Sequence, residues 1–169
     1  MNRALLVLLL MAVTVGTVVA YKDPETAARA SDGVSAMLRK HTASVRAVQV
    51  PRGQGGEFTL QARINGVAAP MVVDTGATSV VLTAEDAKAA GLPLALLNYT
   101  VNIETANGRA RAAPVTLDRI AMGELEERSV EALVVQPGQL RTSLLGMSFL
   151  NRLQSWQANG DRLVLKGYP

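Results

Sequence analysis

The sequence predicts an all-β domain that contains two short helices and follows an apolar N-terminal helix. Three observations support this prediction. Apolar and polar residues alternate from Phe58 to Ile64, which is typical of a strand with one buried face. Asn-Gly dipeptides, which favour tight hairpin turns, lie between extended stretches at Asn65-Gly66, Asn107-Gly108 and Asn159-Gly160. An uncharged, mostly apolar run from Ala4 to Ala20 precedes all of these elements.

Residues 1–21 are predicted to be a membrane anchor. Arg3 and the N-terminal amine precede the apolar run, as positive charge precedes segments that insert from the cytoplasm. A spanning helix needs about 20 apolar residues, so the run is short for an anchor and long for the core of a signal peptide. We favour a retained anchor over a signal peptide cleaved after Ala20. Either interpretation places the rest of the chain on the extracytoplasmic (periplasmic) side of the inner membrane, and the anchor interpretation makes the protein single-pass.

Residues 22–56 are predicted to be a flexible spacer, and residues 57–169 the folded domain. The spacer is rich in Ala, Ser, Arg and Gly and ends in Gly53-Gln54-Gly55-Gly56. His41, the only histidine, lies in this segment without an acidic partner, so we interpret it as a solvated side chain. The remaining chain has the size of one domain.

The domain is expected to be antiparallel, because each turn signal joins two extended stretches. Val67–Val73 follows the first Asn-Gly turn, and Pro70 within it indicates an edge or a bend because proline has no N–H to donate. The apolar pattern resumes at Val80–Leu82. The other predicted strands are Asn98–Thr105, Ala110–Leu117, Glu131–Val135, Ser155–Ala158 and Arg162–Lys166.

Two short helices interrupt the strands. Thr83 is a good N-cap, with Asp86 three residues later as its capping-box partner, and Gly91 ends the run. The second predicted helix, Met147–Leu153, follows Gly146 and carries apolar residues on one side.

Composition excludes several kinds of function. The chain has no cysteine, so disulfides, thiolate metal sites and a cysteine nucleophile are excluded. The formal net charge is +3, and the basic residues are scattered rather than clustered, so no nucleic-acid partner is expected. We expect no metal ion and no organic cofactor.

One carboxylate stands out, because a buried strand leads directly into it. Met71-Val72-Val73 precedes Asp74, and Thr75 and Gly76 follow. A charged group at the end of a buried strand is costly unless it is hydrogen-bonded or paired. Gly76 allows a sharp turn that brings backbone N–H groups near the carboxylate, and the Thr75 hydroxyl can bond to a neighbouring backbone.

Asp74-Thr75-Gly76-Ala77, preceded by an apolar strand, resembles the active-site loop of retropepsin-like aspartic peptidases. Ser143–Leu150, with Leu144-Leu145-Gly146 leading into a short helix, resembles the late element that packs beneath this loop. The N-terminal apolar segment, the spacer and the single domain are similar to the membrane-anchored members of this family in bacteria. The resemblance covers roughly residues 58–165 and implies a small, closed or partly open barrel.

The resemblance also implies the site residues. Asp74, Thr75 and Gly76 would form the catalytic loop. The hairpin around Asn107-Gly108 falls where the family has the flap that covers the substrate. The residues expected to bind a peptide or protein substrate are therefore Ala77, Thr105, Ala106, Asn107 and Gly108.

A count of carboxylates predicts a homodimer. Peptide hydrolysis of this kind needs two carboxylates that share a proton and a water molecule. The sequence has one Asp-Thr-Gly, so the second carboxylate would be Asp74 of another copy, brought close by a two-fold axis. Two like charges a few Å apart cannot both ionise easily, so such a pair should act at acidic pH. In the family, strands from the chain ends often complete the dimer interface, and Arg162–Lys166 is the strand that could do so here.

Two other interpretations remain. The first is a non-catalytic dimerisation or peptide-binding module with the same fold. The second is an exported structural β domain, in which both motifs would be coincidences. An intact Asp-Thr-Gly favours the enzyme over both, because a degenerate copy has no physical reason to keep a carboxylate there.

Overall fold

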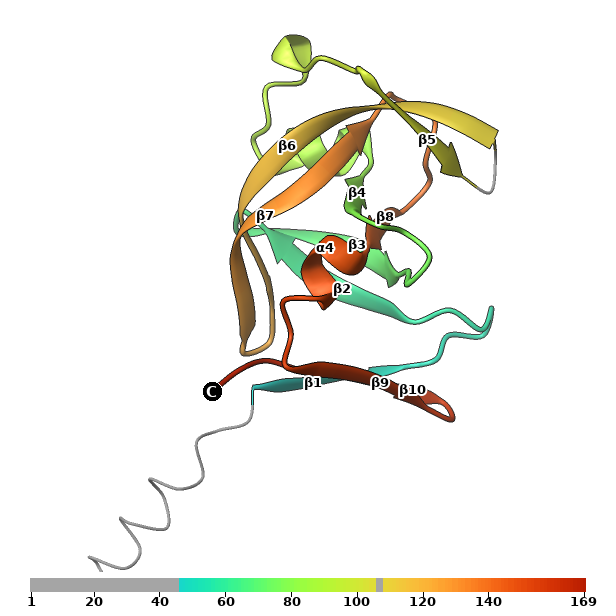
Figure 1. The fold of residues 1–169 in the computed structure, drawn as a ribbon, viewed down its shortest axis with the longest axis vertical. Helices are drawn as coiled ribbons and strands as arrows, with labels where there is room; N and C mark the ends of the chain where they lie inside the picture. The colour runs from blue at the N-terminus through green and yellow to red at the C-terminus, as the bar shows by residue number, and fades with distance from the viewer. Residues whose placement is uncertain (1–45, 106–107) are drawn as a thin grey trace, which may run out of the picture. The chain divides into compact units, whose positions relative to one another are not determined.

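The computed structural model describes residues 46–105 and 108–169 (Figure 1). These residues belong to one compact unit, Val45–Pro169. The predicted anchor and most of the predicted spacer lie outside the described residues, as do Ala106 and Asn107 of the predicted flap. Among the helices that are described, none is long and apolar enough to cross a membrane.

Most strands belong to one seven-stranded sheet with the order β2-β3-β8-β4-β7-β6-β5. The strand β2 also pairs with β6, so the sheet closes into a barrel and β5 extends it as an additional strand along β6 (Figure 1). The expected all-β barrel is therefore confirmed. The strands are β2 Thr59–Ile64, β3 Val67–Val73, β4 Val80–Leu82, β5 Val101–Thr105, β6 Gly108–Met122, β7 Leu125–Val135 and β8 Ser143–Leu145.

A second sheet has three strands in the order β1-β10-β9, with β1 at Ala47–Pro51, β9 at Ser155–Asn159 and β10 at Arg162–Lys166. The prediction of a flexible spacer up to residue 56 is wrong for β1. Its Val50 is 2% exposed and belongs to the hydrophobic core, and β1 pairs with β10 along its whole length. Burial of this alternating strand stabilises it, whereas the glycine-rich segment that follows concealed the pattern.

The prediction of a purely antiparallel sheet is also wrong. The pairs β3–β8 and β4–β7 are parallel, whereas β4 and β8 are antiparallel. Parallel neighbours need long connections, which leave no local turn signal in the sequence. As a result β8 lies between β3 and β4, and the chain from β3 to β4 must pass over the end of β8.

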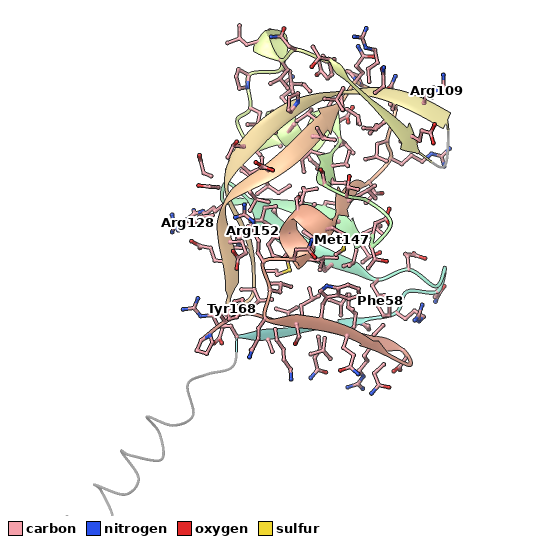
Figure 2. The ribbon with its side chains drawn as sticks, in the orientation of Figure 1. Phe58, Arg109, Arg128, Met147, Arg152 and Tyr168 are labelled. Carbon is pink, nitrogen blue, oxygen red and sulfur yellow. The ribbon has the colours of Figure 1, made fainter. Side chains whose placement is uncertain are left out.

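The hairpin of β6 and β7 is longer than predicted, because a local interruption of its pairing hides the full length of both strands in the sequence. Leu117 pairs with Val130 and Arg119 with Arg128, so Asp118 and Ser129 lie opposite each other in an unchanged register but do not pair. Ser129 has a φ of 51°, a local distortion of the strand, and the alternation of apolar and polar residues is broken here although no residue is inserted. Figure 2 shows Arg152 near Arg128, and the Arg152 guanidinium donates to the carbonyls of Arg128 (2.6 Å) and Ser129 (2.8 Å).

The two predicted helices and the first hairpin turn are present. The helix α3 spans Ala84–Ala89, and the hydroxyl of its N-cap Thr83 accepts from the Asp86 N–H at 3.0 Å. The helix α4 spans Met147–Leu150 and is shorter than predicted, and a 3-10 turn, η1, covers Leu94–Leu96. In the first turn Asn65 and Gly66 both have positive φ, as a tight hairpin requires.

Candidate active site

The loop after β3 carries Asp74 and lies across the end of β8. The Asp74 N–H donates to the Leu145 carbonyl at 3.2 Å, and the Met147 N–H at the start of α4 donates to the Ala77 carbonyl at 2.9 Å. The Ala77 N–H also donates to the Asp74 carbonyl at 3.3 Å. The turn is therefore fixed by its own backbone and by the β8–α4 segment beneath it.

Gly146 permits this close approach. A Cβ at this position would lie 2.1 Å from the Ser79 carbonyl oxygen and 2.8 Å from the Ala77 carbonyl oxygen. Its φ of −92° is open to any residue, so the requirement for glycine here is purely steric. The segment Leu144-Leu145-Gly146 thus supports the Asp74 loop from below.

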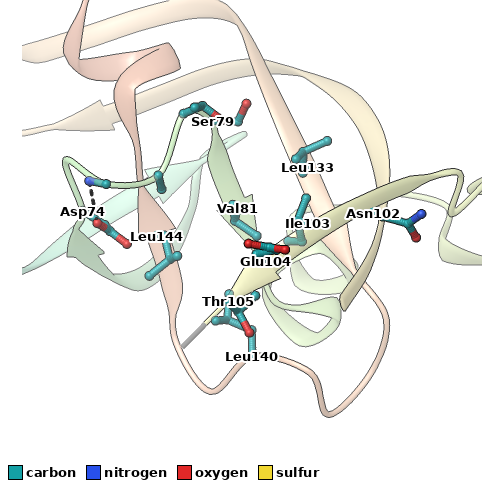
Figure 3. A pocket seen from close by; sticks show the side chains of 13 residues that line it. Asp74, Ser79, Val81, Asn102, Ile103, Glu104, Thr105, Leu133, Leu140 and Leu144 are labelled. Carbon is teal, nitrogen blue, oxygen red and sulfur yellow. Dashed lines mark hydrogen bonds between the residues drawn. The ribbon is translucent and has the colours of Figure 1, made fainter. Parts of the chain in front are cut away.

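The Asp74 carboxylate is half-buried. Its Oδ1 accepts from the Gly76 N–H at 2.8 Å, the bond drawn in Figure 3. This is the one hydrogen bond of the carboxylate among the described residues, so its second oxygen is open to a ligand. Thr75 is exposed, and no hydrogen bond of its hydroxyl is found among the same residues.

A pocket of about 620 Å³ opens beside this carboxylate (Figure 3). Its apolar side chains come from β4, β5, β7, β8 and the segment that leads into β8, and they form part of a small hydrophobic cluster. These apolar residues are Val81, Ile103, Leu133, Leu140 and Leu144. The polar and small residues of the lining are Asp74, Gly76, Ala77, Thr78, Ser79, Asn102, Glu104 and Thr105.

The structure brings some of the predicted site residues together. Ala77 and Thr105 line the pocket with Asp74 and Gly76. Gly108 does not line it, but pairs with Thr105 across the hairpin, and the Thr105 hydroxyl donates to the Gly108 carbonyl at 2.8 Å. Ala106 and Asn107 lie outside the described residues, so their predicted role stays a prediction.

Sequence reasoning missed part of the pocket wall. Leu133 and Leu140 are far from Asp74 in the chain and reach the pocket through the parallel pairing of β4 with β7 and the return of the chain into β8. Only the position of Leu144 in the motif beneath the loop indicated that this residue lies near the site. Glu104 and Asn102 lie on β5. The alternation of residues predicted this strand but not which of its faces is turned to the pocket.

A buried hydroxyl holds the support in place. Ser143 at the start of β8 is fully buried, and its Oγ accepts from the Thr83 N–H at 3.1 Å and donates to Asp86 Oδ2 at 2.5 Å. Asp86 therefore binds Ser143 with its side chain rather than closing the predicted capping box. Ser148 similarly accepts from the Val80 N–H at 2.9 Å. Across residues 46–105 and 108–169, no three His, Cys, Asp or Glu side chains converge as a metal site would require.

The chain is similar to known aspartyl proteases. Residues 60–152 match the family of gag-polyprotein putative aspartyl proteases. The crystal structure of a retropepsin-like aspartic protease from Rickettsia conorii superposes with a TM-score of 0.67 and 37% sequence identity, covering 73% of this chain and 92% of that one.

Two uncharacterized bacterial proteins are also similar. One, from a Sinorhizobium species and named for the cobV 5′ region, is 47% identical over 111 residues, which is 66% of this chain and 48% of that protein. The other, from Rickettsia prowazekii, is 37% identical over 126 residues, which is 75% of this chain and 54% of that protein. The chain thus spans about half the length of the curated relatives it matches.

Proposed function

Because this chain belongs to the gag-polyprotein putative aspartyl protease family and has a retropepsin-like fold, we propose that it is an aspartic endopeptidase that acts as a homodimer. The observation that carries the proposal is the state of Asp74. The carboxylate stands on a braced loop at the mouth of an apolar pocket, and one of its oxygens is open. Such a group is positioned to bind water but lacks the second carboxylate that this kind of peptide hydrolysis requires.

The other carboxylate of the pocket does not meet this need. Glu104 lies on β5, and among the described residues no hydrogen bond joins it to Asp74. Two carboxylates that share a proton must lie within hydrogen-bond distance of each other or of one water molecule. The partner in the proposed enzyme is therefore Asp74 of a second copy, related by a two-fold axis.

In the paired site the two carboxylates divide the work. One accepts a proton from a bound water as the water oxygen attacks the peptide carbonyl carbon, and the other donates its proton to the carbonyl oxygen. The first carboxyl group then gives its new proton to the nitrogen as the C–N bond of the tetrahedral diol breaks. A hydroxyl group of the diol returns a proton to the second carboxylate as the product carboxylic acid forms, which restores the shared proton. The Gly76 N–H holds each carboxylate in orientation throughout. The apolar pocket wall binds a side chain of the substrate next to the cleaved bond.

The N-terminal segment has a role in this proposal. If residues 1–21 anchor the protein in the inner membrane, with the domain on the periplasmic side, confinement to the membrane raises the effective concentration of partners. A pair that associates weakly in solution then forms at the membrane. The substrates would be peptides or proteins that reach the same surface.

The experiment compares three variants of the full chain in detergent. Asp74→Asn should keep the fold but abolish hydrolysis of a peptide library at acidic pH, because an amide cannot share the proton. Asp118→Asn, a matched change at an exposed position of β6, should cleave as the unmodified chain does. Glu104→Gln should also remain active, since the proposal gives Glu104 no proton to transfer.

The other possible results of this experiment each favour a different interpretation. Cleavage by Asp74→Asn at the normal rate would refute the proposal. Loss of cleavage in Glu104→Gln, with normal substrate binding, would instead indicate a pair within one chain. Peptide binding without cleavage by the unmodified chain would favour the non-catalytic module.

A further inference from the structure

The pocket beside Asp74 contains a second carboxylate, that of Glu104 (Figure 3). Among the described residues that line the pocket, these two are charged and none is basic. In the proposed mechanism the two copies of Asp74 share a proton and act on the cleaved bond, whereas Glu104 transfers no proton. The chemistry therefore leaves the presence of Glu104 in the lining unexplained.

Glu104 has no partner of its own within residues 46–105 and 108–169. Arg109 lies opposite it on β6, but no ion pair joins the two side chains. The carboxylate also accepts no hydrogen bond from the described residues, and the side chain is exposed. This carboxylate is therefore available to a ligand that enters the pocket.

The rest of the pocket suits the stem of a long side chain. Its wall is apolar and includes Val81, Ile103 and Leu144. Burial alternates along β5, so Ile103 is half-buried in this wall and Glu104 is exposed at its rim. Lysine and arginine lay their CH₂ groups along apolar surface and keep the charged end at a polar, solvated position. A basic side chain of the substrate matches this arrangement of wall and rim.

A second polar group lies beside Glu104. Asn102 is two residues earlier on β5, so it lies on the same face of the strand, and it also lines the pocket. Its amide oxygen accepts hydrogen bonds, and a guanidinium carries five N–H donors. An arginine side chain therefore has enough donors to bind both residues.

We infer that Glu104 selects substrates that carry a lysine or an arginine near the cleaved bond. This inference rests on the proposed function and names the substrate class of the same site. In the paired enzyme the two-fold axis repeats the pocket, so each half of the substrate meets one Glu104. Preferred substrates then carry a basic residue on each side of the cleaved bond.

The first test compares peptides that differ in charge but hardly in shape. Each peptide carries arginine or citrulline, the neutral isostere of arginine, at one position near the cleaved bond. The unmodified full chain should have a kcat/KM on the order of five- to tenfold higher for the arginine peptide, because the substrate covers the ion pair. Arginine on both sides should give the product of the two single ratios. In Glu104→Gln these ratios should approach one, mainly through KM.

Glu124→Gln is the matched control. Glu124 is exposed in the turn between β6 and β7 and does not line the pocket, so this variant changes the net charge equally and should keep the preference. Glu104→Lys should reverse the preference, so that glutamate peptides are cleaved faster than glutamine peptides. High salt should reduce the preference of the unmodified chain, because a charge at the rim is screened. A purely structural role of Glu104 predicts neither the reversal nor the salt effect.

The outcomes separate this inference from the proposed function. Equal ratios in the unmodified chain and Glu104→Gln, or an equal loss of preference in Glu124→Gln, would overturn the role of Glu104 and leave the peptidase intact. If the unmodified chain cleaves no peptide, the proposed function fails, and the binding constants of the same peptides test the pocket. Tighter binding of arginine than of citrulline that disappears in Glu104→Gln would support the inference, and equal binding would overturn it.

Discussion

Gly146 provides the sharpest test of how the Asp74 loop is supported. Replacing it with alanine places a Cβ 2.1 Å from the Ser79 carbonyl oxygen and 2.6 Å from the Ser79 carbonyl carbon. An ordinary contact between non-bonded carbon and oxygen is about 3.4 Å, so backbone on one side must move by more than about 1 Å. The atoms in conflict are all backbone, and no flexible side chain can yield.

This displacement should be costly. Overpacking of a core site typically costs about 1–3 kcal/mol, and a clash with rigid backbone falls at or above the upper end of that range. Total stabilities are about 5–15 kcal/mol, so Gly146→Ala should lower the melting temperature by on the order of 10 °C. The bond from the Met147 N–H to the Ala77 carbonyl would stretch at the same time, so peptide cleavage should fall further than stability alone explains.

Gly53→Ala is the matched control for this change. It is a glycine outside the left-handed region of φ whose added Cβ would meet mainly Glu57, at 3.2 Å from the carboxylate end of that side chain. Its effect should stay within about 1 kcal/mol. Thermal denaturation of both variants by circular dichroism measures the difference. A Gly146→Ala protein as stable and active as Gly53→Ala would refute the close packing of the loop on β8.

Two further outcomes are expected. Ser143→Ala should destabilise the domain by about 2–3 kcal/mol in urea denaturation, because it leaves the buried Thr83 N–H without its acceptor and removes the donor to Asp86; an unchanged midpoint would contradict this. Peptide cleavage by the unmodified chain should be fastest at acidic pH and fall as the pH rises, because the paired site needs one carboxylate to keep its proton. The cleavage rate is measured as a function of pH in a stopped assay. A rate that rises steadily through neutral pH would contradict the mechanism in which two carboxylates share a proton.

Local chemistry allowed much of the fold to be predicted. The turn at Asn65-Gly66 and the N-cap at Thr83 each depend on a few adjacent residues, and the structure has both. The loop at Asp74 was found in the same way, from an apolar strand, a carboxylate and a glycine in sequence.

The features that were missed depend on distant residues. The strand β1 is stable because Val50 packs into a core made by later strands, and its own composition gives no such indication. The parallel pairing of β3 with β8 joins Val73 to Leu145, which are far apart in the chain. That pairing also requires glycine at position 146, and the sequence could not show what this residue approaches.

The central claim is that two copies each supply one Asp74 to a single site. The most direct measurement mixes the unmodified full chain with increasing amounts of Asp74→Asn, allows the subunits to exchange, and records peptide cleavage at fixed total protein. If only pairs with two intact carboxylates cleave, activity should follow the square of the intact fraction, about one quarter at equal amounts. A linear decline to about one half would show that each chain works alone, and would contradict the account.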